Sequence, residues 1–495
     1  MTSCVAWRWA SVACGGGDEQ CHSRCLSVRQ LSIRQSGFRV GEGVIDTERV
    51  VMGVEGVADA AVGGGPRLAE GTELIGEYQG SGFQEPRFIV RRVDGQVIQL
   101  PRLLFLLASL LDGRRDLQAL AGLLSGEFGK VVAPQQVSYL IDNRLRPVGI
   151  VAADPGMVAA GGAPMMQLKS DPLLALKFRV GVIPERVVWW IAGLFGWMFW
   201  PPVIFAGLAV FVMVDVAVIA GGGLGQIVPS ALALVYQPAL TLLVLAMVLV
   251  SAAFHECGHV AACRYGGARP GKMGFGLYLV WPALYSTVTD SYRLSRAGRL
   301  RTDLGGVYFN AVFIAGMGLA YLYTGSPWLL VAIVLMHIET ATQFLPVIRM
   351  DGYYILSDLI GVPDLFSRLG PVLKSMLPGR PTHPRVAELK PWVRRTITGW
   401  VLVVVPALLY WVIGFLIIVP QVFPVVWDRM LELGSLTGAA AATGSVAETV
   451  LGGIQIVLLL LPWAGGLLLF CMIMHRPLRW ALTRWTPARL RVRRS

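Results

Sequence analysis

The most regular feature of this 495-residue chain is a series of long apolar stretches separated by short polar ones. A helix needs about 20 apolar residues to cross the ~30 Å hydrocarbon core of a membrane. Six stretches have this length and predict six membrane-spanning helices, at residues 197–220, 238–262, 305–324, 327–345, 397–420 and 450–474. Residues 187–200 are rich in tryptophan, and we interpret them as an interfacial lead-in to the first span. A separate span there stays the alternative. The tryptophans concerned are Trp189, Trp190, Trp197 and Trp200.

Composition and charge agree with a multi-pass membrane protein. Hydrophobic residues make up 55% of the chain and charged residues 15%, which excludes an ordinary soluble enzyme. Basic residues exceed acidic ones by seven to two in residues 264–303 and by eight to four in residues 347–395, and the end of the chain from His475 holds seven arginines and no acid. Basic loops stay in the cytoplasm, so six spans place both termini there. The net charge of +12 then reflects topology and attraction to the lipid bilayer, and does not indicate nucleic acid.

The second predicted span ends in a His-Glu-x-x-His pattern, formed by His255, Glu256 and His259. On a helix, histidines four residues apart leave the same face, and Glu256 stands beside the first of them. Imidazole nitrogens bind zinc, and a neighbouring carboxylate can accept a proton from zinc-activated water. The pattern therefore predicts one Zn²⁺ ion held by His255 and His259, with Glu256 as general base. The alternative is a site that binds metal, or packs its histidines, without catalysis.

Asp351 is the best candidate for a third zinc ligand. It follows the fourth predicted span, between Pro346, which ends regular helix, and Gly352, which permits a tight turn. In the six-span topology the fourth span runs inward, so Asp351 reaches the same side of the membrane as His259. The alternative is that Asp351 only caps the helix that follows it.

At this point the chain resembles a known family. The His255-Glu256-x-x-His259 pattern, a small-residue span with Gly305-Gly306 and Asn310, and a later Asp351-Gly352 are similar to the site-2 protease family of intramembrane zinc metalloproteases. The runs 281–285, 301–310 and 349–354 resemble its bacterial branch of peptide zinc metalloproteases. Two positions depart from the usual pattern: Gly-Gly-x-x-x-Asn replaces Gly-Pro-x-x-Asn, and Met rather than Leu precedes Asp351.

The resemblance implies ligand roles for His255, His259 and Asp351 and a general-base role for Glu256. It also implies that Asn310 takes part in catalysis by holding the substrate strand or its developing oxyanion. A bacterial cell membrane, and substrates connected with peptide modification and export, follow from the same resemblance.

Other polar residues in the predicted spans have more than one interpretation. His337 and Glu339 are two apart and point about 200° away from each other on a helix. One of them could support the metal, but a histidine bonded to a neighbouring helix is the preferred interpretation. Asp215 stays unassigned. Cys257 and Cys263 are interpreted as small packing residues rather than ligands.

The segment before the first span predicts a small α+β domain over residues 71–155. A strand at 88–90 and helices at 100–111, 116–128 and after Pro134 are typical of a winged helix. The domain resembles the winged-helix domains that bind the leader segment of ribosomally made peptides. A DNA-binding winged helix is disfavoured, because residues 91–154 contain eight basic and six acidic residues, too balanced a charge for a surface that binds phosphates.

The remaining segments carry little chemistry. Residues 1–70 are predicted to be a disordered extension or translation upstream of a true start near Met52. Residues 156–186 form a linker, 187–475 the membrane metalloprotease domain and 476–495 a basic cytoplasmic tail. Thiols in a cytoplasmic N-terminus stay reduced, so no disulfide is expected.

The sequence thus predicts a six-span zinc endopeptidase with a winged-helix-like cytoplasmic docking domain. Its expected substrate is a membrane-associated or exported peptide, and its expected partners are a precursor leader or a peptide exporter. Two alternatives stay open. One is cleavage of a membrane-tethered anti-sigma factor, and the other is a catalytically silent membrane partner of a peptide exporter.

Overall fold

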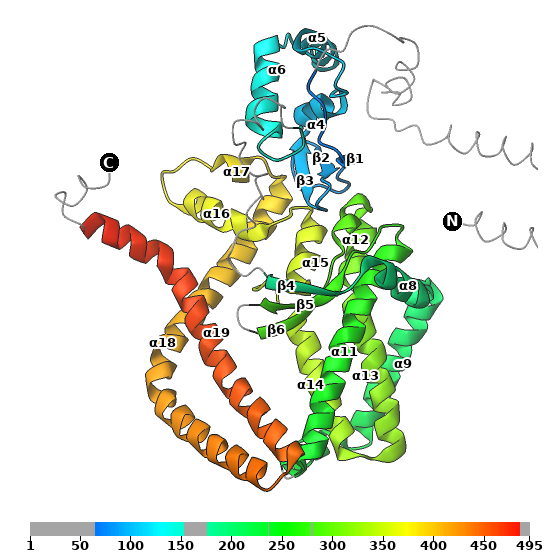
Figure 1. Ribbon diagram of the computed structural model, residues 1–495, viewed down its shortest axis with the longest axis vertical. Coiled ribbons are helices and arrows are strands. Elements are labelled where there is room, and N and C mark those ends of the chain that lie inside the picture. Colours follow the sequence, from blue (N-terminus) through cyan, green and yellow to red (C-terminus); the bar gives the residue numbers. More distant parts are fainter. Residues whose placement is uncertain (1–64, 153–175, 236, 279–280, 486–495) are drawn as a thin grey trace, which may run out of the picture. The chain divides into compact units, whose positions relative to one another are not determined.

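The computed structural model describes residues 65–152, 176–235, 237–278 and 281–485. Within these ranges the chain is mostly helical and contains two small antiparallel sheets (Figure 1). The predictions made for residues 1–64, for most of the linker and for the last ten residues lie outside the described residues. The four cysteines before residue 26 belong to that group.

Five described helices are long and apolar enough to cross a membrane. They are α9 (Pro201–Ala220), α11 (Pro238–Tyr265), α13 (Gly305–Thr324), α18 (Pro391–Ala442) and α19 (Val446–Trp485). The predicted fourth span forms α14 (Pro327–Gln343). Its 17 residues extend only about 26 Å, which is less than the ~30 Å thickness of the hydrocarbon core. The chain leaves the helix before Pro346, since a proline disfavours helical backbone in the residue before it. The finding agrees with a membrane protein.

The N-terminal part of the described chain builds a sheet of order β1-β2-β3 followed by helices. Its strands are β1 (Glu73–Glu77), β2 (Arg87–Arg91) and β3 (Val97–Pro101), and its helices are α4 (Arg102–Ser109), α5 (Leu117–Phe128), α6 (Pro134–Leu140) and the π-helical turn η1 (Ile141–Leu145). Asp116 starts α5 by accepting a hydrogen bond from the amide of Ala119 at 2.7 Å, as an N-cap residue does. The sheet and helices share one apolar core that includes Val90, Leu107 and Leu120. The predicted strand and three helices are therefore confirmed.

A second sheet was not predicted. It joins β4 (Leu176–Ile183), β5 (Met273–Tyr278) and β6 (Trp281–Ser286) in antiparallel order β4-β5-β6. Its first strand lies in the segment predicted to be a linker, about 90 residues before the other two. Pairing across such a distance is decided by tertiary contacts, so the local sequence carries little signal for it.

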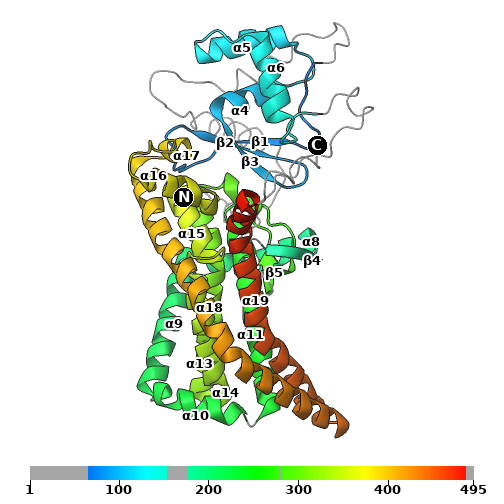
Figure 2. The ribbon, with the colours of Figure 1, turned by 90° about the vertical axis from the view of Figure 1, so that its left-hand side faces the viewer.

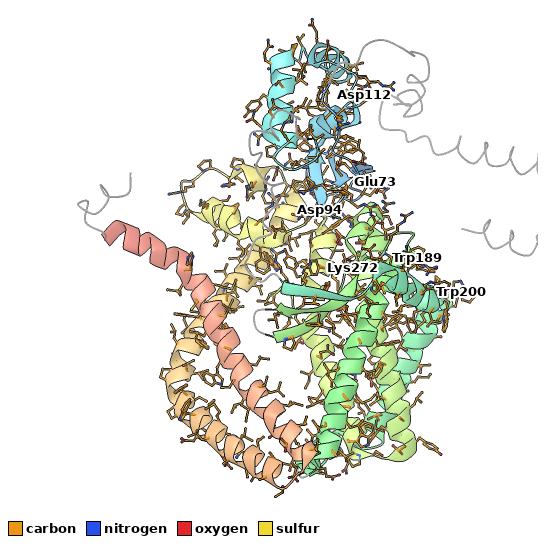
Figure 3. The ribbon with its side chains drawn as sticks, in the orientation of Figure 1. Glu73, Asp94, Asp112, Trp189, Trp200 and Lys272 are labelled. Atoms are coloured by element: carbon orange, nitrogen blue, oxygen red, sulfur yellow. The ribbon has the colours of Figure 1, made fainter. Side chains whose placement is uncertain are left out.

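Helix α8 (Glu185–Phe195) and the 3-10 turn η2 (Gly196–Phe199) occupy the tryptophan-rich stretch before α9. Val188 and Ala192 of α8 are buried, whereas Trp190 is 79% exposed. Figure 3 labels Trp189 on α8 and Trp200 beside the start of α9. The one-sided burial of α8 supports the interfacial interpretation.

Two predicted boundaries were wrong. Residues 221–237 lie between the first two predicted spans, where no helix was predicted, but they contain α10 (Gly223–Val235), which contacts α14. Helix α18 continues past the predicted end at residue 420, through the prolines at 406, 420 and 424. An apolar surrounding makes an unpaired backbone group costly, so the helix persists although proline removes single hydrogen bonds. Figure 2 shows α18 and α19 converging toward the turn that joins them.

Short elements connect α11 to α13 and α14 to α18. The first group comprises β5, β6, η3 (Thr289–Arg293) and α12 (Arg296–Asp303). The second comprises α15 (Asp351–Ile360), η4 (Leu365–Arg368), α16 (Leu369–Met376) and α17 (Pro384–Ala387). Helices α12 and α15 contact each other, which brings together the segments that follow α11 and α14.

Candidate metal centre

His255 and His259 lie one turn apart on α11, and both side chains are buried. Their ring centroids are 4.7 Å apart and their Nε2 atoms are 3.0 Å apart. Two polar rings buried in an apolar helix need a partner. The geometry confirms that the two imidazoles share one face.

Asp351 is the first residue of α15, and its carboxylate reaches the two histidines. Its Oδ2 atom is 3.0 Å from Nε2 of His255 and 3.4 Å from Nε2 of His259. Met350 occupies the N-cap position of α15, and no side chain caps that helix. The carboxylate thus faces the imidazoles instead of capping its own helix. Ninety-two residues separate His259 from Asp351 in the sequence, and the fold brings them together.

The backbone of α12 orients one of the imidazoles. Nδ1 of His259 lies 2.8 Å from the carbonyl oxygen of Thr302. A carbonyl oxygen only accepts, so Nδ1 carries the proton and Nε2 faces the cluster. Sequence reasoning missed this contact, because a backbone oxygen leaves no mark in the residue type at position 302.

Glycines allow α11 and α13 to approach each other at the centre. A Cβ atom on Gly306 would collide with the imidazole rings of His255 and His259. A Cβ atom on Gly258 would collide with the backbone carbonyl of Gly305. Gly352 likewise lies against the carbonyl of Phe344. Small residues at these positions leave the space that the cluster occupies.

The three donor atoms fit a tetrahedral zinc site. Ligands 2.0–2.2 Å from zinc stand roughly 3.3–3.5 Å from one another. The separations here are 3.0, 3.0 and 3.4 Å, so a shift of a few tenths of an ångström would open the site to that size. A carboxylate beside two imidazole lone pairs is unfavourable without a positive charge among them. Asp351 and the two histidines therefore fit a bound cation.

Glu256 completes the group on α11. One of its carboxylate oxygens and the ring nitrogens of His255 and His259 all lie within 4.8 Å of one another. The side chain is only partly buried. This places a proton acceptor beside the donor cluster, as the His-Glu-x-x-His spacing predicts.

Asn310 is fully buried in α13 and belongs to a hydrogen-bond chain with α14. Its Nδ2 donates to Thr340 Oγ1 at 3.0 Å and to Gln343 Oε1 at 3.1 Å. Gln343 in turn donates to Glu339 at 2.9 Å. The Oδ1 atom of Asn310 is buried and has no hydrogen-bond partner among the described residues. The structure thus engages both amide hydrogens of Asn310 with α14.

The other polar residues of the spans have separate partners. Nε2 of His337 lies 3.2 Å from a carboxylate oxygen of Asp215 on α9, so this histidine contacts a neighbouring helix, as preferred above. Cys257 and Cys263 carry free thiols, and Cys263 is buried.

The end of α12 that supports His259 is also polar. Asp303 follows Thr302, and burial together with the nearby charge of Asp358 raises the pKa of the Asp303 carboxyl well above its ordinary value. Arg299, on the same helix, donates to Asp358 at 2.9 Å. The cluster of His255, His259 and Asp351 thus has the buried ion pair of Arg299 and Asp358 behind it, on α12 and α15.

Comparison with curated proteins finds a distant relative. No protein-family model matches the chain, and no solved structure matches it. The chain is similar to the "Putative peptide zinc metalloprotease protein YydH" of Bacillus subtilis (strain 168), with 30% identity over 122 residues. The match covers 24% of this chain and 48% of the relative, so the chain spans about half the length of the curated relative that it matches. The chain is thus a distant, partial relative of that protein and carries a His-Glu-x-x-His group of its own.

Proposed function

We propose that this protein is a membrane-embedded zinc metalloendopeptidase. The observation that carries the proposal is the meeting of His255, His259 and Asp351, whose donor atoms are 3.0 to 3.4 Å apart, with Glu256 beside them. The similarity to a protein named as a peptide zinc metalloprotease supports the same chemistry. His255, His259 and Asp351 are the proposed ligands of one Zn²⁺ ion.

Zinc bound there would supply Lewis acidity toward water and toward the scissile carbonyl. Glu256 accepts the proton of the attacking water and delivers it to the leaving amine, as a general base and then a general acid. The carbonyl of Thr302 keeps His259 in the tautomer that presents Nε2. Gly306 keeps the face of both imidazoles clear.

We retain Asn310 as the group that binds the substrate strand or its oxyanion. The side-chain amide is a suitable donor for a developing negative charge. In this role Asn310 exchanges a hydrogen bond to Thr340 or Gln343 for one to substrate.

The preferred topology has six spans and places both termini in the cytoplasm. The six spans are the five long apolar helices and α14, which is the fourth in chain order. The positive charge of residues 264–303 and 347–395 supports this orientation. The metal centre then lies near the cytoplasmic side of the membrane. Substrate peptides enter there as extended strands.

The preferred substrate is the precursor of a small ribosomal peptide, or another exported peptide. The N-terminal domain, proposed to be a winged helix, binds the leader segment of that precursor. Its nearly balanced charge disfavours contact with nucleic acid, which leaves peptide binding as the preferred role.

The test is the Glu256→Gln variant of the purified, detergent-solubilised protein. We expect one zinc per chain in both wild type and variant, because Glu256 is not a proposed ligand. Cleavage of a mixture of synthetic membrane-associated peptides, followed by mass spectrometry, is expected to fall at least about 100-fold. Glu432→Gln, at an exposed ion pair of α18, is the matched control and keeps full activity.

Two outcomes contradict the proposal. Wild-type protein without stoichiometric zinc removes the metal centre. Equal cleavage by wild type and Glu256→Gln removes Glu256 as the base. If the protein is instead a catalytically silent membrane partner of a peptide exporter, wild type and Glu256→Gln are expected to behave alike and peptide export is expected to be unchanged.

A further inference from the structure

Arg299 is a fully buried arginine at the contact between the N-terminal domain and α12. Its guanidinium group donates to Asp358 at 2.9 Å, to the carbonyl of Leu294 at 3.0 Å and to the carbonyl of Gln79 at 3.1 Å. It also lies over the ring of Tyr78, 4.2 Å from the centroid. One side chain therefore contacts the N-terminal domain, α12 and α15 at once.

Tyr78 closes this arrangement from the N-terminal domain. Its side chain is fully buried, and its hydroxyl donates to the same oxygen of Asp358 at 3.0 Å. Asp358 thus accepts from Arg299 and from Tyr78 through one atom. A buried carboxylate and a buried guanidinium each need such partners, since neither is solvated by water.

Of the two helices joined by this node of Tyr78, Arg299 and Asp358, α12 supports His259 and α15 carries Asp351. Thr302, three residues after Arg299 on α12, supplies the carbonyl that holds Nδ1 of His259. Asp351 lies seven residues before Asp358 on α15, which is about two turns, so both carboxylates leave the same face of that helix. Moving α12 relative to α15 would therefore change the distance between His259 and Asp351.

A second set of contacts attaches the same domain beside the node. Arg91 pairs with Glu73 at 2.6 Å and with Asp290 at 3.0 Å. Arg293 pairs with the same two carboxylates at 2.7 Å and 3.1 Å. The four groups form a closed ring of alternating charge between the β1-β2 strands and η3, and Figure 3 labels Glu73 in it. The ring fixes the domain next to Tyr78 and Arg299.

We propose that Arg299 and Tyr78 are positioning residues of the metal centre. Through Asp358 they hold α12 and α15 in the relative position that brings His259 and Asp351 within reach of one cation. Docking of the N-terminal domain is then a condition for a correctly shaped site. This inference rests on the proposed metal centre and adds its control by the N-terminal domain.

The test uses Co²⁺ in place of zinc in the full-length, solubilised chain. The visible absorption of bound Co²⁺ reports coordination geometry, and competition with a chelator reports affinity. We expect Arg299→Met to weaken Co²⁺ binding about tenfold and to change the spectrum, as loss of an outer support does. We expect Arg299→Lys to bind Co²⁺ more tightly than Arg299→Met does and less tightly than wild type. Tyr78→Phe, which removes one hydroxyl only, weakens binding by a few-fold and changes the spectrum in the same direction.

Arg87→Gln is the matched control. Arg87 pairs with Glu388 at 2.8 Å and so joins the same domain to a segment beyond α15, and among the described residues no hydrogen bond or ion pair links Arg87 to α12. We expect wild-type affinity and spectrum from this variant. Tyr78→Phe decides the question if Arg299→Met fails to fold, as judged by helix content and elution volume.

Two results would overturn the inference while leaving the metal centre intact. The first is folded Tyr78→Phe and Arg299→Lys protein with the spectrum and affinity of wild type. The second is an equal loss in Arg87→Gln, which would indicate general loosening of the domain. A wild-type chain that binds no Co²⁺ and no zinc overturns the proposed metal centre, and this inference with it.

Discussion

Helices α13 and α18 are both long and apolar enough to cross a membrane, yet different surroundings enclose them. In the most apolar 18-residue window of each helix, 56% of the residues of α13 are buried within the protein, against 17% for α18. The mean hydropathy of that window is 2.8 in α18, twice the value of 1.4 in α13. Polarity is tolerated in a span where protein rather than lipid surrounds it.

The same contrast explains where the small and polar residues lie. Helix α13 contains Gly305, Gly306 and Asn310, and all three are buried against α11 or α14. Gly414 of α18 has no atom within 4 Å of where its Cβ would be. Glycine and asparagine in α13 therefore serve close packing and hydrogen bonding, whereas α18 depends on apolar side chains. The following predictions test that contrast, from the largest expected effect to the smallest.

Loss of a proposed ligand has the largest expected effect. His259→Ala removes one of three metal donors, so we expect zinc content near zero and peptide cleavage lower by at least about 10³-fold. His337→Ala is the matched control, because His337 is a histidine of the neighbouring α14 that contacts Asp215 instead. Elemental analysis and cleavage rates measure both variants. Zinc retained by His259→Ala would show that the cluster is not the metal site.

Asn310→Ala is expected to affect catalysis and stability together. Removing a proposed oxyanion donor lowers kcat about 10²-fold at unchanged zinc content. The lost hydrogen bonds to Thr340 and Gln343 lower the free energy of unfolding by about 1–3 kcal/mol. Denaturant titration and initial rates separate the two effects. An unchanged kcat in a destabilised variant would restrict Asn310 to packing.

Gly306→Ala tests the close approach of α13 to the histidines. The added methyl group collides with both imidazoles, so we expect a loss of about 1–3 kcal/mol in unfolding free energy and weakened zinc binding. Gly316→Ala on the same helix and Gly414→Ala on α18 are controls with open space at the Cβ position. Each control is expected to be neutral or to gain up to about 1 kcal/mol, because alanine favours helix. Equal losses in all three variants would contradict the contrast.

The smallest effect is expected at the exposed edge of the domain contact. Burial by itself would raise the pKa of the Glu73 carboxyl, but the charges and hydrogen bonds of Arg293 and Arg91 hold that pKa below its ordinary value. A lowered folded-state pKa means that the stabilisation is complete above the unfolded-state pKa, about 4.3, and is lost as pH falls below it. Because 43% of the Glu73 side chain is exposed, solvent screening keeps the effect small.

We therefore expect Glu73→Gln to lower the melting temperature slightly at pH 7 and to remove part of the acid sensitivity between pH 5 and pH 3. Glu85→Gln, an exposed glutamate of the same domain, is the control. Added salt is expected to reduce the difference between wild type and Glu73→Gln. If the melting temperatures of wild type and Glu73→Gln still differ by the same amount at pH 3, the ion pairs of Glu73 are not the cause of the difference.

Local patterns in the sequence were sufficient for five long apolar helices, for the domain helix that starts at Asp116, and for the shared face of His255 and His259. Each depends on periodicity, length or capping within one segment. Asp351 was also identified, because a carboxylate between Pro346 and Gly352 just past an apolar run is unusual. Helix ends were less certain, as the continuation of α18 past residue 420 shows.

Contacts between distant segments were decided only by the tertiary structure. The β4-β5-β6 sheet, the carbonyl of Thr302 behind His259, and the node of Tyr78, Arg299 and Asp358 join residues that are about 40 to 280 positions apart. A backbone carbonyl has no residue-type signature, and a buried ion pair is recognised only when both partners are placed. The sequence alone could therefore name the chemical groups, and packing decided which of them meet and what holds them there.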